Sequence, residues 1–252
     1  MSMLRTQSLV KRYGGLTVTD SVSLNIVAGE LHALIGPNGA GKTTLINQIS
    51  GELPSDSGSV FFNGDDVTAF DIAERARRGL QRSYQITSVF VEFTVLENVM
   101  LAAAGATGHG FEFWRPLLAQ GAIARAARQA LADTGLDREA NTLADALSYG
   151  QRRQLELAMS LAGHPRFLLL DEPLAGMSTQ ESAHVIALLR RLKNQYTILL
   201  VEHDMDAVFA LADRISVLVY GKIIFTGTPQ EVRAHPEVKA VYLGHGEEVA
   251  HG

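Results

Sequence analysis

The stretch GPNGAGKTTL, residues 36–45, follows the apolar segment LHALIG and precedes a segment with helical character. Residues 36–43 fit the pattern G-x-x-x-x-G-K-[ST], which in this strand–loop–helix context is typical of a phosphate-binding loop. Glycines let several backbone N–H groups converge on one anion, and the N-terminus of a helix adds favourable partial charge. A glycine-rich turn that fits the pattern by chance is the alternative, and the flanking strand and helix argue against it.

The loop therefore predicts contact with a nucleoside triphosphate. Lys42 is expected to reach the β- and γ-phosphates, and the hydroxyl of Thr43 is expected to bind Mg²⁺. The predicted nucleotide-binding residues of the loop are Gly36, Pro37, Asn38, Gly39, Ala40, Gly41, Lys42, Thr43 and Thr44.

Two more candidate groups follow buried-strand patterns. FLLLDE, residues 167–172, ends in Asp171, which can hold Mg²⁺ through its water shell, and in Glu172, which can orient or deprotonate an attacking water. A solvated strand end is the alternative for this acidic pair, and the phosphate-binding loop upstream favours the site. TILLVEHD, residues 197–204, places His203 where it could donate a hydrogen bond to the γ-phosphate. A structural role is the alternative for a histidine considered alone.

Composition limits the class of protein. The chain has 252 residues, 46% of them hydrophobic and 19% charged, which is ordinary for a globular protein with one core and a subdomain. Its net charge of −5 indicates no general affinity for polyanions, so nucleic acid is not an expected partner. The absence of cysteine excludes disulfides and thiolate metal sites. The N-terminal segment does not resemble a signal peptide, and no apolar run approaches the ~18 residues needed to cross a bilayer.

The order of predicted elements indicates an α/β fold. Residues 4–35 read as strands separated by turns, residues 42–49 as a helix, and residues 58–67 as a strand with a turn at Asn63-Gly64. Residues 92–165 are helical in pattern, and within them residues 122–136 form an amphipathic helix. One side of that helix carries Ile123, Ala127, Ala130, Leu131 and Thr134. Strands at 166–172 and 196–204, separated by a helix at 179–193, predict parallel pairing, and residues 214–227 predict a hairpin turning at Tyr220-Gly221.

The stretch LSYGQRRQLELA, residues 147–158, narrows the class of ATPase. Together with the loop and the strand-end acids, it resembles the nucleotide-binding subunit of an ATP-binding cassette (ABC) transporter, whose signature loop is usually L-S-G-G-Q. The resemblance implies a P-loop NTPase (RecA-like) core with a mostly parallel sheet, an N-terminal antiparallel β-subdomain and an inserted α-helical subdomain. It implies a single ABC ATPase domain over 1–252, with its catalytic core and β-subdomain at 1–91 and 161–235. The helical subdomain with the signature loop would be 92–160, and the C-terminal tail 236–252.

The same resemblance implies further roles. Two copies would pack head to tail, so that Ser148, Gly150 and Gln151 contact the γ-phosphate held by the partner copy. Tyr13 would stack on the adenine, with a half-buried strand tyrosine as the alternative. Gln85, in RSYQIT, would contact Mg²⁺ and the attacking water and mark the junction with the helical subdomain. The sequence departs from the family at Tyr149, which replaces a glycine, and at Ser178, where an aspartate is common; both departures put in doubt how the two sites communicate.

The segments KRYGGLTVTDSVSL and GTPQEVRAHPEVKAVYLG and a long helical insert at about 105–145 resemble importers of branched-chain amino acids. That resemblance implies ATP and Mg²⁺ as ligands, and two integral membrane permease subunits as partners. It also implies a homodimer or a heterodimer with a related ATPase subunit. An extracytoplasmic solute-binding protein would be an indirect partner. The chain would be peripheral on the cytoplasmic face of the inner membrane. A groove around Gln85 and the helical subdomain would receive a permease helix. The irregular histidines of the tail GHGEEVAHG do not predict a metal site.

Three alternatives stay open at this stage. The same role could serve urea, short amides or other amino acids, whose importers have similar ATPase subunits. A soluble ABC ATPase of DNA repair or translation is disfavoured by the single cassette and the acidic balance. A P-loop kinase would lack the signature loop and would need an acceptor pocket or lid.

Overall fold

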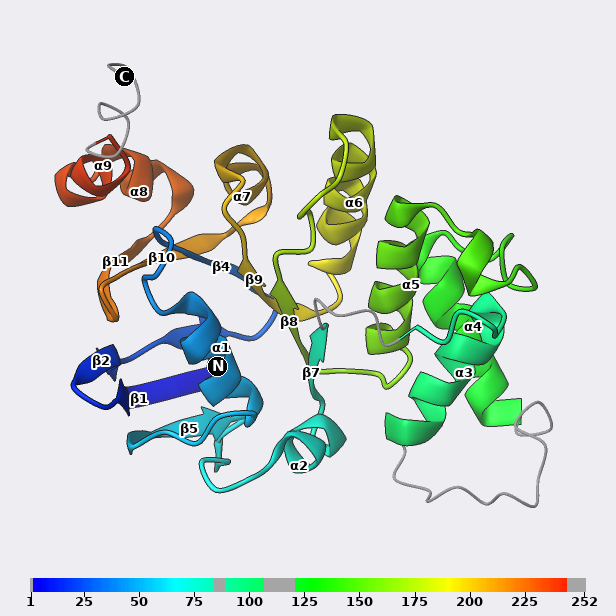
Figure 1. Ribbon diagram of the computed structural model, residues 1–252, viewed down its shortest axis with the longest axis horizontal. Coiled ribbons are helices and arrows are strands. Elements are labelled where there is room, and N and C mark those ends of the chain that lie inside the picture. Colours follow the sequence, from blue (N-terminus) through cyan, green and yellow to red (C-terminus); the bar gives the residue numbers. More distant parts are fainter. Residues whose placement is uncertain (1, 84–88, 107–120, 244–252) are drawn as a thin grey trace. The chain divides into compact units, whose positions relative to one another are not determined.

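The computed structural model describes residues 2–83, 89–106 and 121–243 (Figure 1). The chain forms two compact units: unit 1 comprises Met1–Ile72 and Thr197–Gly252, and unit 2 comprises Ala73–Tyr196. Gln85, residues 107–120 of the expected helical insert and the histidine-containing tail lie outside the described residues. Within the described ranges, no helix combines the length and the apolar character that a bilayer crossing requires.

Unit 1 contains the predicted antiparallel subdomain. β1 (Ser2–Tyr13) pairs with β2 (Leu16–Val22), β3 (Asn25–Val27) and β5 (Ser57–Phe62), and β5 pairs with β6 (Asp65–Asp66). Asn63 and Gly64 both adopt positive φ, 50° and 92°, as a tight hairpin turn requires. The predicted antiparallel strands and this turn are confirmed.

Unit 1 also contains the strands that lead to the phosphate-binding loop. β4 (Leu31–Ile35) pairs in parallel with both β9 (Thr197–Val201) and β10 (Arg214–Val219), and β10 pairs antiparallel with β11 (Lys222–Gly227). All residues of β4 and β9 are buried, which is why their sequences are mostly apolar rather than alternating, with His32 and Thr197 as the exceptions. The predicted turn at Tyr220-Gly221 is confirmed, with φ of 46° and 78°.

The helices of unit 1 follow these strands. They are α1 (Lys42–Ser50), α7 (Met205–Leu211), α8 (Pro229–Ala234) and α9 (Pro236–Leu243). The predicted helix at 42–49 corresponds to α1, which ends at Gly51 in the left-handed conformation. Glycine is favoured there because a side chain would strain a positive φ.

Unit 2 begins within α2 (Ile72–Arg77) and contains the parallel pair β7 (Leu80–Ser83) and β8 (Phe167–Asp171). α3 (Val95–Ala106) packs against α4 (Gly121–Thr134) and α5 (Tyr149–Leu161), as Figure 1 shows, and η2 (Ala144–Ala146) precedes α5. α6 (Thr179–Leu192) agrees with the helix expected at 179–193. The buried residues of α4 are the five that the periodicity placed on one side, so that prediction is confirmed.

A buried polar chain fixes β4 within unit 1. His32 is fully buried; its Nδ1 lies 2.6 Å from Oε1 of Glu30, and its Nε2 lies 2.8 Å from Oγ of Ser216 on β10. Ser216 Oγ in turn lies 2.7 Å from Oγ1 of Thr226 on β11. Burial raises the pKa of Glu30, but hydrogen bonds from His32 and from the N–H of Val27 outweigh it and leave the pKa lowered. Side chains thus tie β4 to β10 and, through Ser216, to β11.

We predict that His32→Ala destabilises the protein by about 3 kcal/mol, because it opens a cavity and removes one hydrogen-bond partner from each of two buried side chains, Glu30 and Ser216. The melting temperature should fall by roughly 6–12 °C in a thermal unfolding experiment. His184→Ala, on the exposed side of α6, is the matched control and should stay within about 2 °C of the wild type. Equal melting temperatures for the two variants would show that the chain does not stabilise β4.

Candidate functional site

The phosphate-binding loop leaves β4 in close contact with its neighbours. A Cβ on Gly36 would lie 2.1 Å from the carbonyl oxygen of Leu218, and a Cβ on Gly41 would lie 2.5 Å from that of Val18. Gly41 also has a φ of 102°. Both positions therefore exclude every side chain, and glycine is required for the backbone to follow this path.

Gly41 is the N-cap of α1, and no side chain caps this helix. The first N–H groups of an α-helix have no partner inside the helix, and the helix dipole favours an anion beside them. The glycine path and the uncapped helix start together fit the phosphates of a nucleotide, which supplies the acceptors that a capping side chain would otherwise provide.

Lys42 places a cation at the same loop. Its side chain is only 9% exposed, and its Nζ donates to the carbonyl oxygens of Gly36 at 2.7 Å and Pro37 at 3.0 Å. Thr43 is exposed and Thr44 is half-buried in the first turn of α1. The loop thus combines a cation, a hydroxyl and backbone donors within nine residues, as the sequence predicted.

His203 leaves the sheet at the same edge as the loop. In the parallel register, Leu34 of β4 lies opposite Val201 of β9, and Gly36 and His203 each follow two residues later. The His203 side chain is 63% exposed, and its backbone N–H donates to the carboxylate of buried Glu202 at 3.0 Å. Glu202 shapes this turn, and sequence reasoning missed it because an acid inside VEHD looks like any strand end.

Tyr13, at the end of β1, is 52% exposed, so its ring is available for stacking. Nζ of Lys11 lies 6.0 Å from the centre of the ring and 2.9 Å from Oδ1 of Asp56. Since the ring is about half exposed at a strand end, the half-buried strand tyrosine remains the alternative, and stacking on the adenine stays a prediction.

Unit 2 holds the acidic pair at the end of β8. Asp171 is 5% exposed, and its Oδ2 accepts a hydrogen bond from Nη2 of Arg82 on β7 at 3.0 Å. Arg82 compensates the charge of the buried carboxylate, and sequence reasoning missed it because the two residues are 89 positions apart. Glu172 has a φ of 47°, a strained conformation for a residue with a side chain. Such strain persists where surrounding structure holds a residue in a set direction.

The signature stretch begins α5. Ser148 is its N-cap: Ser148 Oγ accepts from the N–H of Gln151 at 3.3 Å, and Oε1 of Gln151 accepts from the N–H of Ser148 at 3.0 Å. The N–H of Gly150 donates to Oε1 of Glu181 at 3.2 Å. The three predicted signature residues therefore meet at one helix tip, which also includes a carboxylate that the sequence did not point to.

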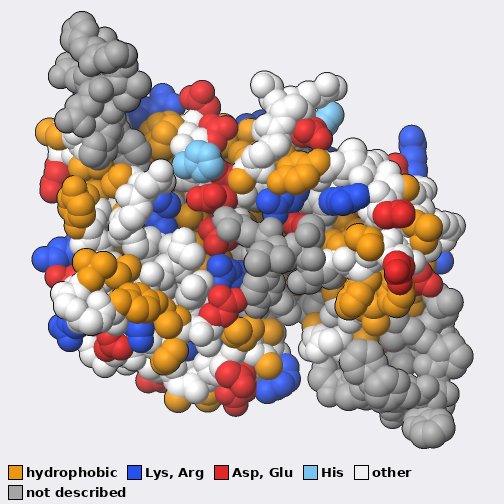
Figure 2. Space-filling model, viewed as in Figure 1, with side chains coloured by type: hydrophobic (Ala, Val, Ile, Leu, Met, Phe, Trp, Pro, Cys, Tyr) orange, Lys and Arg blue, Asp and Glu red, His pale blue; other side chains and the backbone are white. Residues whose placement is uncertain are grey.

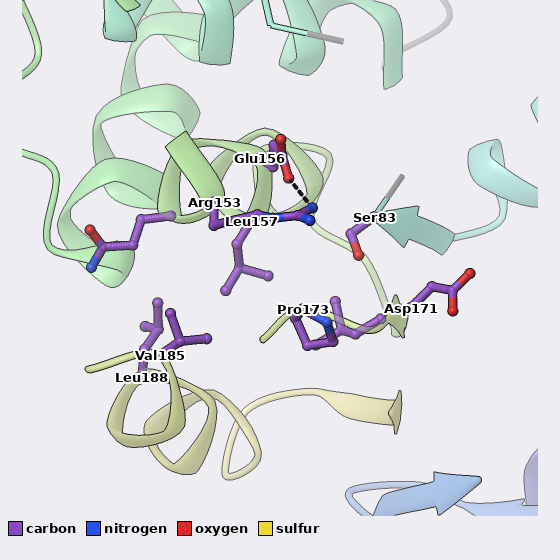
Figure 3. Close-up of a pocket in the computed structure, with 10 residues that line it drawn as sticks. Ser83, Arg153, Glu156, Leu157, Asp171, Pro173, Val185 and Leu188 are labelled. Carbon is purple, nitrogen blue, oxygen red and sulfur yellow. Dashed lines mark hydrogen bonds and ion pairs between the residues drawn. The ribbon is translucent and has the colours of Figure 1, made fainter. Parts of the chain in front are cut away.

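Tyr149 turns toward the segment after Glu172. Its Oη donates to the carbonyl oxygen of Ala175 at 2.9 Å, and Nη2 of Arg153 donates to Oη at 3.2 Å. Nη1 of Arg153 donates to Oε2 of Glu156 at 3.0 Å, beside a cavity that Ser83, Asp171 and Pro173 also line (Figure 3). Burial raises the pKa of Glu156, although Arg153 opposes the shift. The tyrosine that departs from the usual signature thus joins the signature tip to the loop that follows the acidic pair.

The second departure, Ser178, is the N-cap of α6. Its N–H and its hydroxyl donate to Oε2 of Glu181 at 3.0 Å and 2.7 Å, and Ser178 Oγ accepts from the N–H of Glu181 at 3.4 Å. The hydroxyl and N–H of Ser178, with the N–H of Gly150, lower the pKa of Glu181. Ser178 therefore has a defined local role in place of the aspartate common at this position.

The predicted residues fall into two groups. Unit 1 brings together the loop and His203, and unit 2 brings together Asp171, Glu172 and the signature tip. Among the described residues, no group of three or more His, Asp and Glu side chains could hold a metal ion on its own. Of the expected Mg²⁺ ligands, Thr43 and Asp171 would each supply one protein ligand. Few protein ligands suit Mg²⁺, because this ion keeps several waters and is also bound by substrate phosphates.

Comparisons with known proteins agree with this arrangement. Residues 19–175 match the family model described as ABC transporter, and residues 222–248 match the one described as Branched-chain amino acid ATP-binding cassette transporter. The chain is 38% identical to the high-affinity branched-chain amino acid transport ATP-binding protein LivG of Salmonella typhimurium, over 96% of this chain and 98% of that one. It is 34% identical to the lipopolysaccharide export system ATP-binding protein LptB of Haemophilus influenzae, over 97% and 98%.

Among solved structures, the chain resembles the ADP conformation of MJ1267, an ATP-binding cassette of an ABC transporter. The TM-score is 0.86 at 31% identity, and the match covers 97% of this chain and 99% of that one.

We predict that Lys42→Ala weakens ATP binding by about 10- to 100-fold, because the variant removes the charge-assisted hydrogen bonds of the loop. Isothermal titration calorimetry measures the change directly. Lys222→Ala, which removes an exposed lysine paired with Asp20, is the matched control and should bind ATP as the wild type does. If the two variants bind ATP equally well, Lys42 does not contact the phosphates.

Proposed function

Because the chain belongs to the ATP-binding cassette family of ABC transporters, we propose that it is the ATP-hydrolysing subunit of an importer of branched-chain amino acids. The observation that carries the solute class is the match of residues 222–248 to the branched-chain amino acid model. Sequence identity over the whole chain does not distinguish an importer subunit from an exporter subunit well. This chain is 38% identical to LivG and 34% identical to LptB. The match of the C-terminal region to the branched-chain amino acid model supports the importer.

In this proposal the loop holds the nucleotide. Lys42 and the N–H groups of residues 39–44 bind the β- and γ-phosphates, and Tyr13 stacks on the adenine. Thr43, Asp171 and Gln85 would hold Mg²⁺, which would offset the negative charge of the bound phosphates. His203 donates a hydrogen bond to the γ-phosphate.

Glu172 is the proposed base. It orients a water and accepts its proton while the water oxygen bonds to the γ-phosphorus and the bond to the β-phosphate oxygen breaks, giving ADP and phosphate. The strained backbone of Glu172 supports this role, because strain of this kind is common where a side chain must be aimed at a reacting group.

A second copy, or a related ATPase subunit, completes the site. Ser148, Gly150 and Gln151 of one copy cap the γ-phosphate held by Lys42 of the other. The partners are two integral membrane permease subunits and, indirectly, an extracytoplasmic solute-binding protein, with this chain peripheral on the cytoplasmic face of the inner membrane. Residues 92–160 form the helical subdomain, and Gln85 marks its junction with the catalytic core at 1–91 and 161–235. Residues 236–252 form the tail.

The face shown in Figure 2 gives no reason to prefer the alternative of an ATPase that acts on nucleic acid. On the face shown in Figure 2, the described Lys and Arg side chains are interspersed with Asp and Glu side chains. A general nucleic-acid-binding surface would instead gather basic side chains in a patch or stripe.

We predict that Glu172→Gln binds ATP, loses at least about 100-fold in turnover and accumulates as an ATP-bound dimer, because the amide cannot accept the proton of the water. Phosphate release measures turnover, and size-exclusion chromatography with light scattering detects the dimer. Glu231→Gln, on α8, is the control and should turn over ATP normally. Normal turnover in Glu172→Gln would remove the role assigned to Glu172.

We also predict that the solute is a branched-chain amino acid. When the complex with its permease subunits and solute-binding protein is reconstituted in liposomes, leucine, isoleucine or valine should raise ATP turnover severalfold. Urea and short amides are the comparison solutes. If urea alone stimulated turnover, the proposed ATPase function would stand, but the proposed branched-chain amino acid solute would be wrong.

A further inference from the structure

Glu181 serves two elements at once. One carboxylate oxygen, Oε2, completes the capping box of α6 with Ser178, and the other, Oε1, accepts the N–H of Gly150, 31 residues away. A capping box requires only one of the two oxygens. The contact with Gly150 is therefore additional to the local role of Glu181.

Gly150 is shaped for this contact. A Cβ at position 150 would lie 3.1 Å from Oε1 and 3.2 Å from Cγ of Glu181, so the absence of a side chain lets the carboxylate approach the backbone. The carboxylate lies at the N-terminus of α5, where the helix dipole stabilises negative charge. Nearby, the N–H groups of Ser148 and Gln151 are engaged within their own capping box.

Glu181 accepts the N–H of Gly150. In the proposed function, Gly150 instead contacts the γ-phosphate held by a second copy. One N–H cannot serve two anions at full strength, and a carboxylate beside a phosphate repels it. We propose, on the basis of that function, that Glu181 is an internal competitor of the γ-phosphate and must release Gly150 when ATP pairs two copies.

The surroundings allow the side chain to move while the helix tip stays in place. Tyr149 holds the tip through its hydrogen bond to Ala175. Oε2 can keep its bonds to Ser178 while Oε1 turns away, because a cavity lies between the tip and α6. That cavity is lined by Ser148, Gly150, Gln151, Gln154, Glu181, His184 and Val185. Release of Gly150 thus leaves the cap of α6 intact.

The test compares Glu172→Gln with the double variant Glu172→Gln/Glu181→Gln. Glutamine also serves in a capping box but carries no charge, so α6 keeps its cap and the competitor is weakened. The ATP concentration that gives half-maximal dimer, measured by size-exclusion chromatography with light scattering, should fall by about 3- to 10-fold. A melting temperature within about 3 °C of the single variant verifies that the fold is kept.

The chain offers a matched control in α8. Glu231 forms the same capping box with Thr228, whose N–H and hydroxyl donate to its Oε2 at 2.7 Å and 2.9 Å. Glu172→Gln/Glu231→Gln should require the same ATP concentration as Glu172→Gln alone.

The outcomes separate the two proposals. If Glu172→Gln forms no dimer at any ATP concentration, the paired site of the proposed function is wrong, and the inference is wrong with it. If Glu172→Gln dimerises but the Glu181 double variant needs as much ATP or more, the proposed function stands and competition by Glu181 is wrong. The second result would mean that Glu181 only positions the tip.

Discussion

The close approach of the phosphate-binding loop to its neighbours is the constraint on which the site depends. Gly36 and Gly41 come so near the carbonyl oxygens of Leu218 and Val18 that no side chain fits. That path starts α1 without a capping side chain and folds Lys42 back over the loop. The buried chain through His32 fixes the strand from which the path begins. A fully apolar strand could be buried equally well, but it would lack these directional bonds to β10 and β11.

The two adjacent acids of unit 2, Asp171 and Glu172, have different environments. Asp171 is buried and paired with Arg82, so its charge is compensated before any metal binds. Glu172, one residue later, leaves the strand with a positive φ, which turns it away from the regular path of β8. Adjacent carboxylates on one regular strand would point to opposite faces. The strained backbone at Glu172 is compatible with the different roles proposed for the two neighbouring acids, Asp171 toward a cation and Glu172 toward a water.

Local features were readable from the sequence, and long-range pairings were not. The loop, the buried side of α4 and the glycine turns follow from periodicity and from backbone requirements of single residues, and the structure confirms them. Arg82 with Asp171, and Gly150 with Glu181, join positions 89 and 31 residues apart. Nothing in the pattern around Arg82 or Glu181 marks its partner, because an arginine on a short strand and an acid in a first helical turn are both ordinary. The hydrogen bond between His32 and Ser216 was not predicted for the same reason, since a histidine in an apolar run does not indicate which residue it contacts.

The two departures from the usual family sequence are best understood together. Considered separately, Tyr149 replaces a glycine of the signature, and Ser178 replaces an aspartate in the segment after Asp171 and Glu172. In the structure, Tyr149 reaches that loop at Ala175, and Ser178 holds the glutamate that reaches Gly150 of the signature. Each segment therefore supplies a partner to the other, and two hydrogen bonds join them, one of them from a phenol that the usual glycine lacks. These bonds place the signature tip in direct contact with the segment that follows Glu172. The two substitutions therefore connect, within one copy, the segment that follows the proposed base Glu172 to the helix tip proposed to cap the partner's site.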